Sequence, residues 1–410
     1  MMFTYVDNEK SAKIKVIGVG GAGGNAINNM IRSGLQGVKF IAANTDAQAL
    51  EISKSDVRVQ LGDSITEGLG AGANPQIGRD AALETVEELR NALRDSHMVF
   101  ITAGLGGGTG TGATPVIAEI CREMGALTVA VVTRPFSFEG KRRAQIAEQG
   151  LTELKKYVDT AITIPNDRLR ALASKKATLM EMFMKADEIL LHAVKGITDL
   201  IMMPGLVNLD FADVRTTMSK AGMALMGIGV SSGENRALEA AEKAISHPLL
   251  EDISIAGAKG VLMNITASSS MEFEEVAEAS ERIHKEVGED AEIFWGTSVD
   301  DSLGDEMRVT VIATGIGAEV DAARQREKDM AKDKEHEKEK KFAQPLRGKV
   351  RDVTPADLDR TDIVDLDQPT FMRNRRAVGE TSGALYRGVG RMALNDTDLD
   401  VPTFLRRKAD

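Results

Sequence analysis

Short apolar runs rich in β-branched residues alternate with helical patterns along the first 164 residues. The clearest runs predict strands at residues 14–18, 38–42, 98–102, 127–132 and 161–164. Strands separated by helices are typical of a parallel sheet covered on both faces, because parallel strands need a long crossover between them. The pattern therefore predicts a doubly wound α/β domain over residues 13–177, after an N-terminal extension (residues 1–12) that we expect to be flexible.

A different pattern follows this region. A long helical stretch repeats apolar residues along one face and predicts a central connecting helix at residues 178–203; these residues are Leu179, Phe183, Ala186, Leu190, Ala193 and Ile197. Strand-like runs then occur at 223–230, 260–267, 291–297 and 307–314, with helical patterns near 233–246 and 272–287. Residues 204–317 are therefore predicted to form a second, smaller α/β domain.

The C-terminal part of the chain is polar. Residues 321–341 are nearly all charged, with both signs interleaved, so they cannot form a core, and we expect residues 318–397 to be a disordered linker. The chain ends in an apolar and basic tail peptide, residues 398–410. Residues 365–373 (DLDQPTFMR) match residues 398–406 (DLDVPTFLR) at seven of nine positions. Chance identity at that level is improbable inside a low-complexity linker.

Composition excludes several classes of function. The net charge of −11, with no basic patch before the last residues, argues against nucleic acid as the main partner. The single cysteine, Cys121, excludes an internal disulfide framework, and the scattered histidines indicate neither a zinc site nor a catalytic triad. The N-terminus has no apolar signal segment, and no stretch of 18 apolar residues occurs. We therefore expect a cytoplasmic protein without direct membrane insertion.

Residues 104–112, GLGGGTGTG, form the richest glycine loop of the chain, between an apolar strand and a helical pattern. Because glycine has no Cβ atom, the backbone N–H groups of such a loop can converge on one anion. The hydroxyls of Thr109 and Thr111 and the N-terminus of the following helix favour the same ligand. A flexible linker is not expected between a buried strand and a helix. The loop therefore predicts phosphate binding.

A second glycine loop, residues 17–25 (IGVGGAGGN), leaves two interpretations open. The pattern GxGxxG is matched by Gly18, Gly20 and Gly23, and Asp46 follows 23 residues later, which is the spacing of an NAD(P)-linked oxidoreductase. A third short loop, AGANP at 71–75, favours instead a triphosphate held from several sides. The chain also lacks GxxxxGK[ST], so backbone amides rather than a phosphate-binding lysine must hold the ligand.

Together, several motifs resemble the FtsZ family, the tubulin-like GTPases of the bacterial cell-division ring. The motifs are GGAGGN, AGANP, GGGTGTG, RPFSFEGKRR at 134–143, PNDRL at 165–169 and NLDFAD at 208–213. The resemblance extends from about residue 11 to residue 317, and the tail peptide is a separate match. It implies a tubulin-like fold that binds GTP and GDP, with Mg²⁺ bound along with the nucleotide.

The resemblance also implies which residues bind the nucleotide. The phosphate side would comprise Gly21, Ala22, Gly23, Gly24, Asn25, Ala71, Gly72, Gly107, Gly108, Thr109 and Gly110. The ribose and base side would comprise Thr133, Glu139, Arg143, Asn166, Phe183 and Asp187, with Phe183 stacked on the base. A carboxylate such as Asp187 can accept two hydrogen bonds from guanine, whereas adenine presents no such donor pair, which favours GTP over ATP.

Asp210 and Asp213 are three residues apart at a predicted helix start, so both carboxylates lie on one face. Spacing alone favours a pair that caps the helix. The resemblance implies instead that Asn208, Asp210 and Asp213 enter the nucleotide pocket of the next subunit and position the attacking water. Subunits would then add head to tail into filaments, and hydrolysis would depend on assembly. A filament protein that does not hydrolyse GTP is a further alternative.

The tail peptide has the composition of a segment that becomes ordered on binding. The resemblance implies that it docks on regulators and on adaptors that link filaments to the membrane at the division site. Its contact residues would be Asp400, Pro402, Phe404, Leu405 and Arg406. The near copy at 365–373 predicts a second, weaker docking site.

Overall fold

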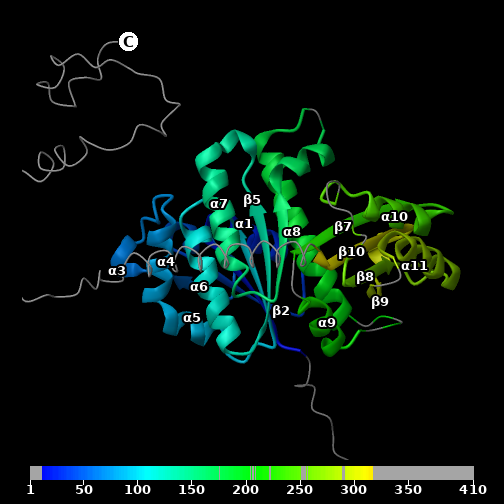
Figure 1. The fold of residues 1–410 in the computed structure, drawn as a ribbon, viewed down its shortest axis with the longest axis horizontal. Helices are drawn as coiled ribbons and strands as arrows, with labels where there is room; N and C mark the ends of the chain where they lie inside the picture. Colours follow the sequence, from blue (N-terminus) through cyan, green and yellow to red (C-terminus); the bar gives the residue numbers. More distant parts are fainter. Residues whose placement is uncertain are drawn as a thin grey trace, which may run out of the picture. The chain divides into compact units, whose positions relative to one another are not determined.

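The structure is a computed structural model and describes residues 12–316, except residues 175, 204, 206, 208, 221, 222, 251–254, 256, 289 and 290. The predicted linker, the tail peptide and its near copy lie outside the described residues, as does residue range 1–11. Within the described part, ten strands form one sheet in the order β3-β2-β1-β4-β5-β6-β7-β10-β8-β9. Figure 1 shows the fold, with β2 and β5 among the labelled strands of the first half and β7, β8, β9 and β10 in the second half.

The first six strands of this sheet run parallel. They are β1 (Ile14–Val19), β2 (Val38–Asn44), β3 (Val57–Gln60), β4 (Met98–Gly104), β5 (Leu127–Arg134) and β6 (Thr160–Pro165). The five predicted strands of this region are confirmed, each slightly longer than predicted. The sequence pattern missed β3, a four-residue edge strand in which only Val59 is buried.

Helices cover both faces of these strands, which confirms the doubly wound arrangement. On one face, α1 (Gly20–Arg32) and α8 (Leu179–Met202) pack against Ile14 and Val16 of β1. Against Ile17 and Val19 on the other face pack α4 (Pro75–Glu84), α5 (Val86–Leu93), α6 (Thr109–Glu123) and α7 (Lys141–Leu154). Shorter elements are α2 (Ala47–Glu51), α3 (Asp63–Thr66) and the 3₁₀ turns η2 (Ser137–Glu139) and η3 (Asn166–Leu172).

The remaining four strands belong to the second half of the chain. They are β7 (Met223–Ser232), β8 (Gly260–Ala267), β9 (Glu292–Val299) and β10 (Glu306–Ile316), and β10 runs antiparallel between β7 and β8. The helical elements here are α9 (Phe211–Met218), α10 (Arg236–Ile245), α11 (Phe273–Val287) and η4 (Asp301–Leu303). The predicted strands and helices are confirmed. The predicted domain boundaries at residues 177, 203 and 317 stay predictions.

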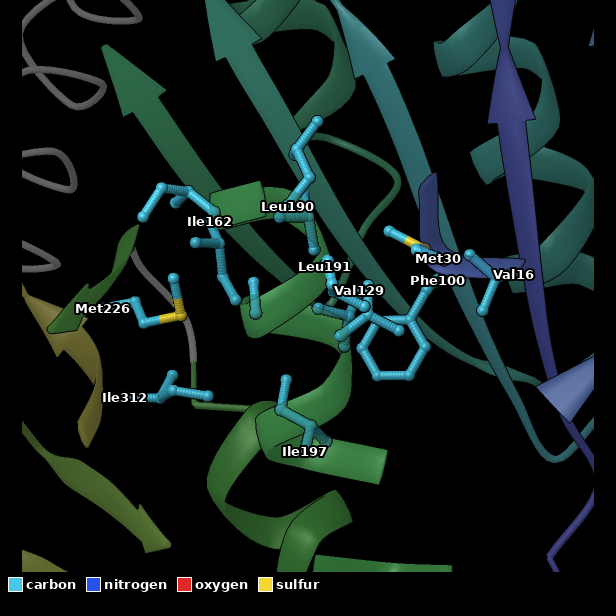
Figure 2. Packing of buried hydrophobic residues seen from close by; sticks show 14 of the residues in the cluster. Val16, Met30, Phe100, Val129, Ile162, Leu190, Leu191, Ile197, Met226 and Ile312 are labelled. Atoms are coloured by element: carbon cyan, nitrogen blue, oxygen red, sulfur yellow. The ribbon is translucent and has the colours of Figure 1, made fainter. Parts of the chain in front are cut away.

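The two groups of strands meet at one short junction. β6 pairs with β7 through only two residue pairs, Ala161 with Met223 and Ile162 with Ala224. Helix α8 covers this junction, and Figure 2 shows Leu190 and Ile197 among side chains of both groups, such as Val129 and Ile312. A fully buried Leu or Ile contributes about 1.5–3 kcal/mol, so α8 holds the two halves together by apolar packing.

Helix α8 begins with a capping box. Thr178 Oγ1 accepts a hydrogen bond from the backbone N–H of Glu181 (3.2 Å), and the Glu181 carboxylate accepts one from the N–H of Thr178 (2.7 Å). The first apolar positions of this helix are exposed, since Leu179 is 56% and Phe183 43% exposed. The next apolar positions of the predicted face, from Ala186 onward, are buried.

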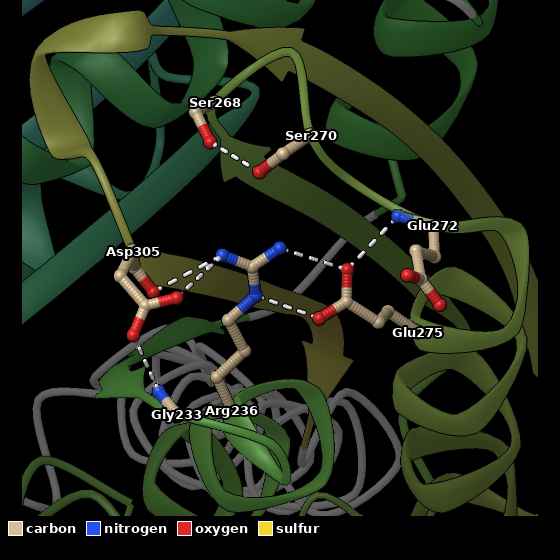
Figure 3. Close-up of polar contacts among 7 residues, drawn as sticks. All are labelled: Gly233, Arg236, Ser268, Ser270, Glu272, Glu275 and Asp305. Atoms are coloured by element: carbon tan, nitrogen blue, oxygen red, sulfur yellow. Dashed lines mark hydrogen bonds and ion pairs between the residues drawn. The ribbon is translucent and has the colours of Figure 1, made fainter.

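Arg236, at the start of α10, contacts Glu275 on α11 and Asp305 just before β10 (Figure 3). Its buried guanidinium donates to both carboxylate oxygens of Glu275 on α11, at 2.6 and 3.0 Å, and to the Asp305 carbonyl oxygen at 3.1 Å. The Asp305 carboxylate in turn accepts the backbone N–H of Gly233 (3.0 Å). Hydrogen bonding to Arg236 lowers the pKa of the Glu275 carboxyl, so the pair stays ionised.

Arg236→Ala is expected to lower the free energy of unfolding by about 3 kcal/mol, because it leaves a largely buried carboxylate without its partner. Urea denaturation measures this value. The matched control is Arg282→Ala, since Arg282 pairs with Glu242 and Glu286 at the surface and such pairs contribute less than about 1 kcal/mol. Equal losses in the two variants would contradict the structural role of the Arg236 network.

Candidate functional site

A cleft of about 290 Å³ opens at the carboxyl ends of β1, β4 and β5. The strand order reverses between β1 and β4, and α1 and α6 start there on opposite faces of the sheet. Open α/β sheets bind ligands at such a switch point. Because two helices direct their N-terminal N–H groups and partial positive charge at one cleft, the site suits a polyanion.

The loop between β4 and α6 is packed so closely that it requires glycine. A Cβ atom on Gly108 would lie 2.8 Å from the Ala71 Cβ atom and 2.9 Å from the Asn74 nitrogen. A Cβ atom on Gly110 would clash with the carbonyl oxygen of Gly104. The loop at 71–75 therefore lies directly against the glycine loop, and both backbones can approach a ligand without side chains between them.

The two threonines of this loop, Thr109 and Thr111, have different surroundings and roles. Thr109 lines the cleft, and its Oγ1 hydrogen bonds with Oγ1 of Thr45 (2.6 Å). Thr111 is buried, and its Oγ1 accepts the backbone N–H of Gly106 (2.8 Å). Thr111 therefore fixes the shape of the loop, whereas only Thr109 can reach a ligand in the cleft.

The other end of the cleft is lined by the first half of α8 and by η3. Asn166 is buried, and its Oδ1 has no hydrogen-bond partner among the described residues. Burial raises the pKa of the Asp187 carboxyl to about 7, and nearby Arg32 opposes this shift. No hydrogen bond to the Asp187 side chain is found in the described part of the chain. Two unpaired acceptors beside a cleft fit a ligand with several N–H donors.

Aromatic rings form one wall at this end. Phe183 lines the cleft, and its ring lies edge-on to that of Phe136, with centroids 5.6 Å apart. Phe136 is buried and stacks on Phe138. Because Phe136 holds the exposed Phe183 in place, the Phe183 face is available to a planar ring.

A charged pair lies between the two ends of the cleft. Arg143 and Glu139 form an ion pair of 2.9 Å, and the second oxygen of Glu139 accepts the N–H of Phe136 (2.8 Å). This pair leaves guanidinium donors of Arg143 available to the cleft.

Thirteen of the seventeen predicted nucleotide-binding residues line this cleft. They are Gly21, Ala22, Asn25, Gly107, Gly108, Thr109, Gly110, Thr133, Glu139, Arg143, Asn166, Phe183 and Asp187. Four do not line it. A Cβ atom on Gly23 would lie 2.5 Å from the Thr102 carbonyl oxygen, so Gly23 serves the packing of α1 on β4. Ala71 lies behind Gly108, while Gly24 and Gly72 face open space.

Several lining residues were not among the seventeen predicted, although Gly20, Gly104 and Leu105 lie in the two glycine loops that the sequence indicated. The lining residues not predicted are Val19, Gly20, Gly104, Leu105, Pro135, Ala186 and Leu190. Ala186 and Leu190 lie three and seven positions after Phe183, so the helical period could have found them.

The carboxylates of residues 208–213 lie elsewhere. Asp210 is the N-cap of α9, and its Oδ1 accepts the backbone N–H of Asp213 at 2.8 Å; Asn208 lies outside the described residues. Neither aspartate lines the cleft. The part of α8 from Asp187 to Met202 separates them from it, and at 1.5 Å per residue this stretch is about 22 Å long. One molecule therefore does not bring carboxylates and cleft together.

The alternative of a dinucleotide site depends on Asp46, and the structure contradicts it. The Asp46 carboxylate caps α2 by accepting the N–H groups of Gln48 (3.0 Å) and Ala49 (3.2 Å). It does not line the cleft, so it is not placed to bind a ribose there.

Comparison with protein families agrees with this geometry. Residues 13–174 match the Tubulin/FtsZ family, GTPase domain, and residues 222–317 match the FtsZ family, C-terminal domain. The chain belongs to the FtsZ family. It is therefore a tubulin-like cell-division GTPase.

Curated relatives cover the chain over its full length. The cell division protein FtsZ of Pseudomonas putida is 48% identical over 411 residues, and that of Pseudomonas aeruginosa is 48% identical over 414 residues; each match covers 100% of both chains.

Solved structures include an empty FtsZ dimer from M. jannaschii, with a TM-score of 0.72, 46% identity and coverage of 75% of this chain and 89% of that one. The GTPγS-bound protofilament of CetZ2 from Haloferax volcanii has a TM-score of 0.64 and 21% identity, covers 78% of this chain and 99% of that one, and shares the fold.

Two negative findings hold for the described residues. None of their helices combines the length and apolar character that a membrane span requires. Nor do three or more His, Cys, Asp or Glu side chains gather there as a metal site.

Proposed function

We propose that this protein assembles head to tail into filaments and hydrolyses GTP at the junction between subunits. The observation that carries this proposal is the separation, within one chain, of the nucleotide cleft from Asp210 and Asp213. A complete site then needs Asn208, Asp210 and Asp213 of a neighbouring subunit. Such a contact uses two different surfaces and does not close, so subunits add without limit. The dimer and protofilament structures of relatives support self-assembly.

Within the cleft, different groups of the chain bind the phosphates and the base of GTP. The amides of the glycine loop and the starts of α1 and α6 bind the phosphates, while Phe183, Asn166 and Asp187 recognise guanine. Mg²⁺ bound with the nucleotide would supply further positive charge, and it commonly relies on phosphate oxygens and water rather than a protein cage. The carboxylates of the next subunit orient water for attack, since phosphoryl transfer depends mainly on positioning and charge stabilisation.

The dependence of turnover on assembly tests this proposal. Phosphate release per molecule is expected to be low in dilute solution and to rise steeply at the protein concentration where light scattering detects filaments. GDP and ATP serve as controls, since neither should support the same assembly. Full turnover by a strictly monomeric preparation would refute the proposal, and filaments without turnover would favour a non-hydrolysing structural protein.

We further propose that the filaments lie in the cytoplasm at the division site and that the tail peptide, through Asp400, Pro402, Phe404, Leu405 and Arg406, binds the adaptors that link them to the membrane. An apolar pair beside basic residues and a proline suits docking in a groove at low entropic cost. The intervening linker, residues 318–397, has an r.m.s. reach of about 50 Å if it behaves as a flexible chain.

The near copy at residues 365–373 is proposed as a second docking site for the same partner. Its apolar contacts with a partner are expected to be weaker, because Gln368 stands at the position of Val401 and Met372 at that of Leu405. We expect a peptide of residues 360–376 to bind an adaptor more weakly than one of residues 394–410, and the full tail to bind a dimeric adaptor more tightly than either. Direct titration measures this. No binding of the 360–376 peptide at millimolar concentration would exclude the second site.

A further inference from the structure

A second cavity, of about 570 Å³, lies at the amino ends of β1 and β2, the edge of the sheet opposite the nucleotide cleft. We call it the basic pocket; its lining includes Lys13, Lys15, Lys39, Arg94, Asp95 and Met202. Four cationic side chains and one carboxylate thus share one concavity on a protein whose net charge is −11. A local excess of positive charge on an acidic chain needs a physical explanation.

Most of this positive charge is uncompensated. Among the described residues, Lys13, Lys39 and Arg94 form no ion pair, and their charged groups donate no hydrogen bond. Lys15 has a structural role, because its Nζ donates to the carbonyl oxygens of Ala92 (2.9 Å) and Arg94 (2.6 Å) at the end of α5. Burial lowers the pKa of Lys15, the charges of Lys39 and Lys13 lower it further, and Asp95 opposes the shift. The cations therefore repel one another, and an anion between them would relieve that repulsion.

The shape of the basic pocket indicates the kind of anion. A concave site of this volume suits a small molecule, whereas nucleic acids and membranes bind extended or flat basic surfaces. Lysine is a compact point charge that binds phosphate well, and arginine adds a bidentate donor. Ile14, Val38 and Met202 also line the cavity and can contact an apolar part of the ligand.

We propose that the basic pocket is a binding site for a small ligand that carries two or more phosphate groups. The ligand's phosphates contact Lys13, Lys39 and Arg94, and Lys15 contributes charge from the floor of the cavity. This site is separate from the GTP cleft, because β1 and β2 run between them from one edge of the sheet to the other. It does not depend on the proposed mechanism of hydrolysis.

The test is calorimetric titration of inorganic tripolyphosphate into the full-length protein at low salt, with saturating GDP present to fill the nucleotide cleft. One binding event per chain is expected. The variant Lys13→Gln/Lys39→Gln/Arg94→Gln should bind about tenfold more weakly or worse, because three charge-assisted contacts are lost. The matched control, Lys54→Gln/Lys155→Gln/Lys285→Gln, removes three positive charges outside the pocket and should bind like the unchanged protein.

Three results would overturn the proposal. One is the absence of tripolyphosphate binding to the GDP-saturated protein. Another is equal weakening in the pocket variant and the control variant, which would indicate only a general charge effect. The third is tighter binding of hexaglutamate than of tripolyphosphate, which would identify an acidic peptide as the ligand. Unchanged GDP affinity and thermal unfolding in the pocket variant show that its loss of binding does not come from misfolding.

Discussion

Asp213→Ala is expected to bind GTP and to assemble, but to lose turnover by about a hundredfold or more, because in the proposed mechanism its carboxylate orients the attacking water. The structure indicates that this variant keeps the N-terminal cap of α9. Asp213 contributes its backbone N–H to the cap of α9, and alanine retains that N–H, while the capping carboxylate belongs to Asp210. Phosphate release from filaments, normalised to light scattering, measures the effect, and GTP affinity is measured separately below the assembly threshold.

Two controls separate catalysis from assembly for Asp213. Asp213→Asn keeps the size of the side chain but removes its charge, so it should be nearly as inactive. In an equal mixture with the unchanged protein, half of the subunit junctions carry an intact carboxylate segment, so co-assembled filaments should retain about half of the activity. Filaments of pure Asp213→Ala that hydrolyse GTP at the unchanged rate would remove Asp213 from the mechanism.

The glycine loop at residues 104–112 was predictable from the sequence because its cause is local. Gly108 and Gly110 are required by contacts within and between adjacent loops, and such requirements leave a compact pattern such as GGGTGTG. The parallel strands were predictable for a similar reason. A strand buried on both faces is a nearly continuous apolar run, and β4 (Met98–Gly104) shows it, with Thr102 as its one polar side chain.

Features that depend on distant residues could not be predicted in this way. The junction of β6 and β7 consists of two residue pairs that leave no periodic signal. Periodicity placed Phe183, Ala186 and Leu190 on one face of α8, but it did not show that this part of the face lines the cleft. Gly23 belongs to a binding motif by spacing, yet its contact with Thr102 serves packing. The basic pocket is lined by residues near positions 13, 39, 94 and 202. Because these positions are far apart in the sequence, no short motif predicts the pocket.

The pH dependence of GTP binding should identify Asp187 as the group that recognises guanine. In its proposed role the ionised carboxylate accepts the two guanine donors, but in the free cleft burial raises the pKa of Asp187 to about 7. As pH falls below about 7, the free carboxyl gains a proton that must leave on binding, so GTP affinity should fall by up to about tenfold per pH unit. Nucleotide titrations between pH 6 and 8, values near that pKa, measure this. A flat profile would contradict the assignment.

Whereas GTP affinity should rise with pH, the contribution of Asp187 to the stability of the nucleotide-free protein should fall as pH rises. In the folded protein the pKa of Asp187 is raised from its ordinary 3.8 to about 7. The favourable contribution of the protonated side chain to the free energy of unfolding is therefore fully present below pH 3.8 and is lost as the pH rises through about 7. Asp187→Asn removes the buried charge. The nucleotide-free variant is therefore expected to be more resistant to heat than the unchanged protein above pH 7 and to show no such advantage in acid.

The same substitution should exchange the base preference of the cleft. An asparagine amide at position 187 accepts the N1–H of guanine but presents an NH₂ group to the 2-amino group, so two donors face each other and GTP affinity should fall about a hundredfold. Xanthine has a carbonyl at that position, which can accept from the amide. Asp187→Asn should therefore bind and hydrolyse xanthosine triphosphate better than GTP. Equal loss for both nucleotides would mean that Asp187 supports the cleft without reading the base.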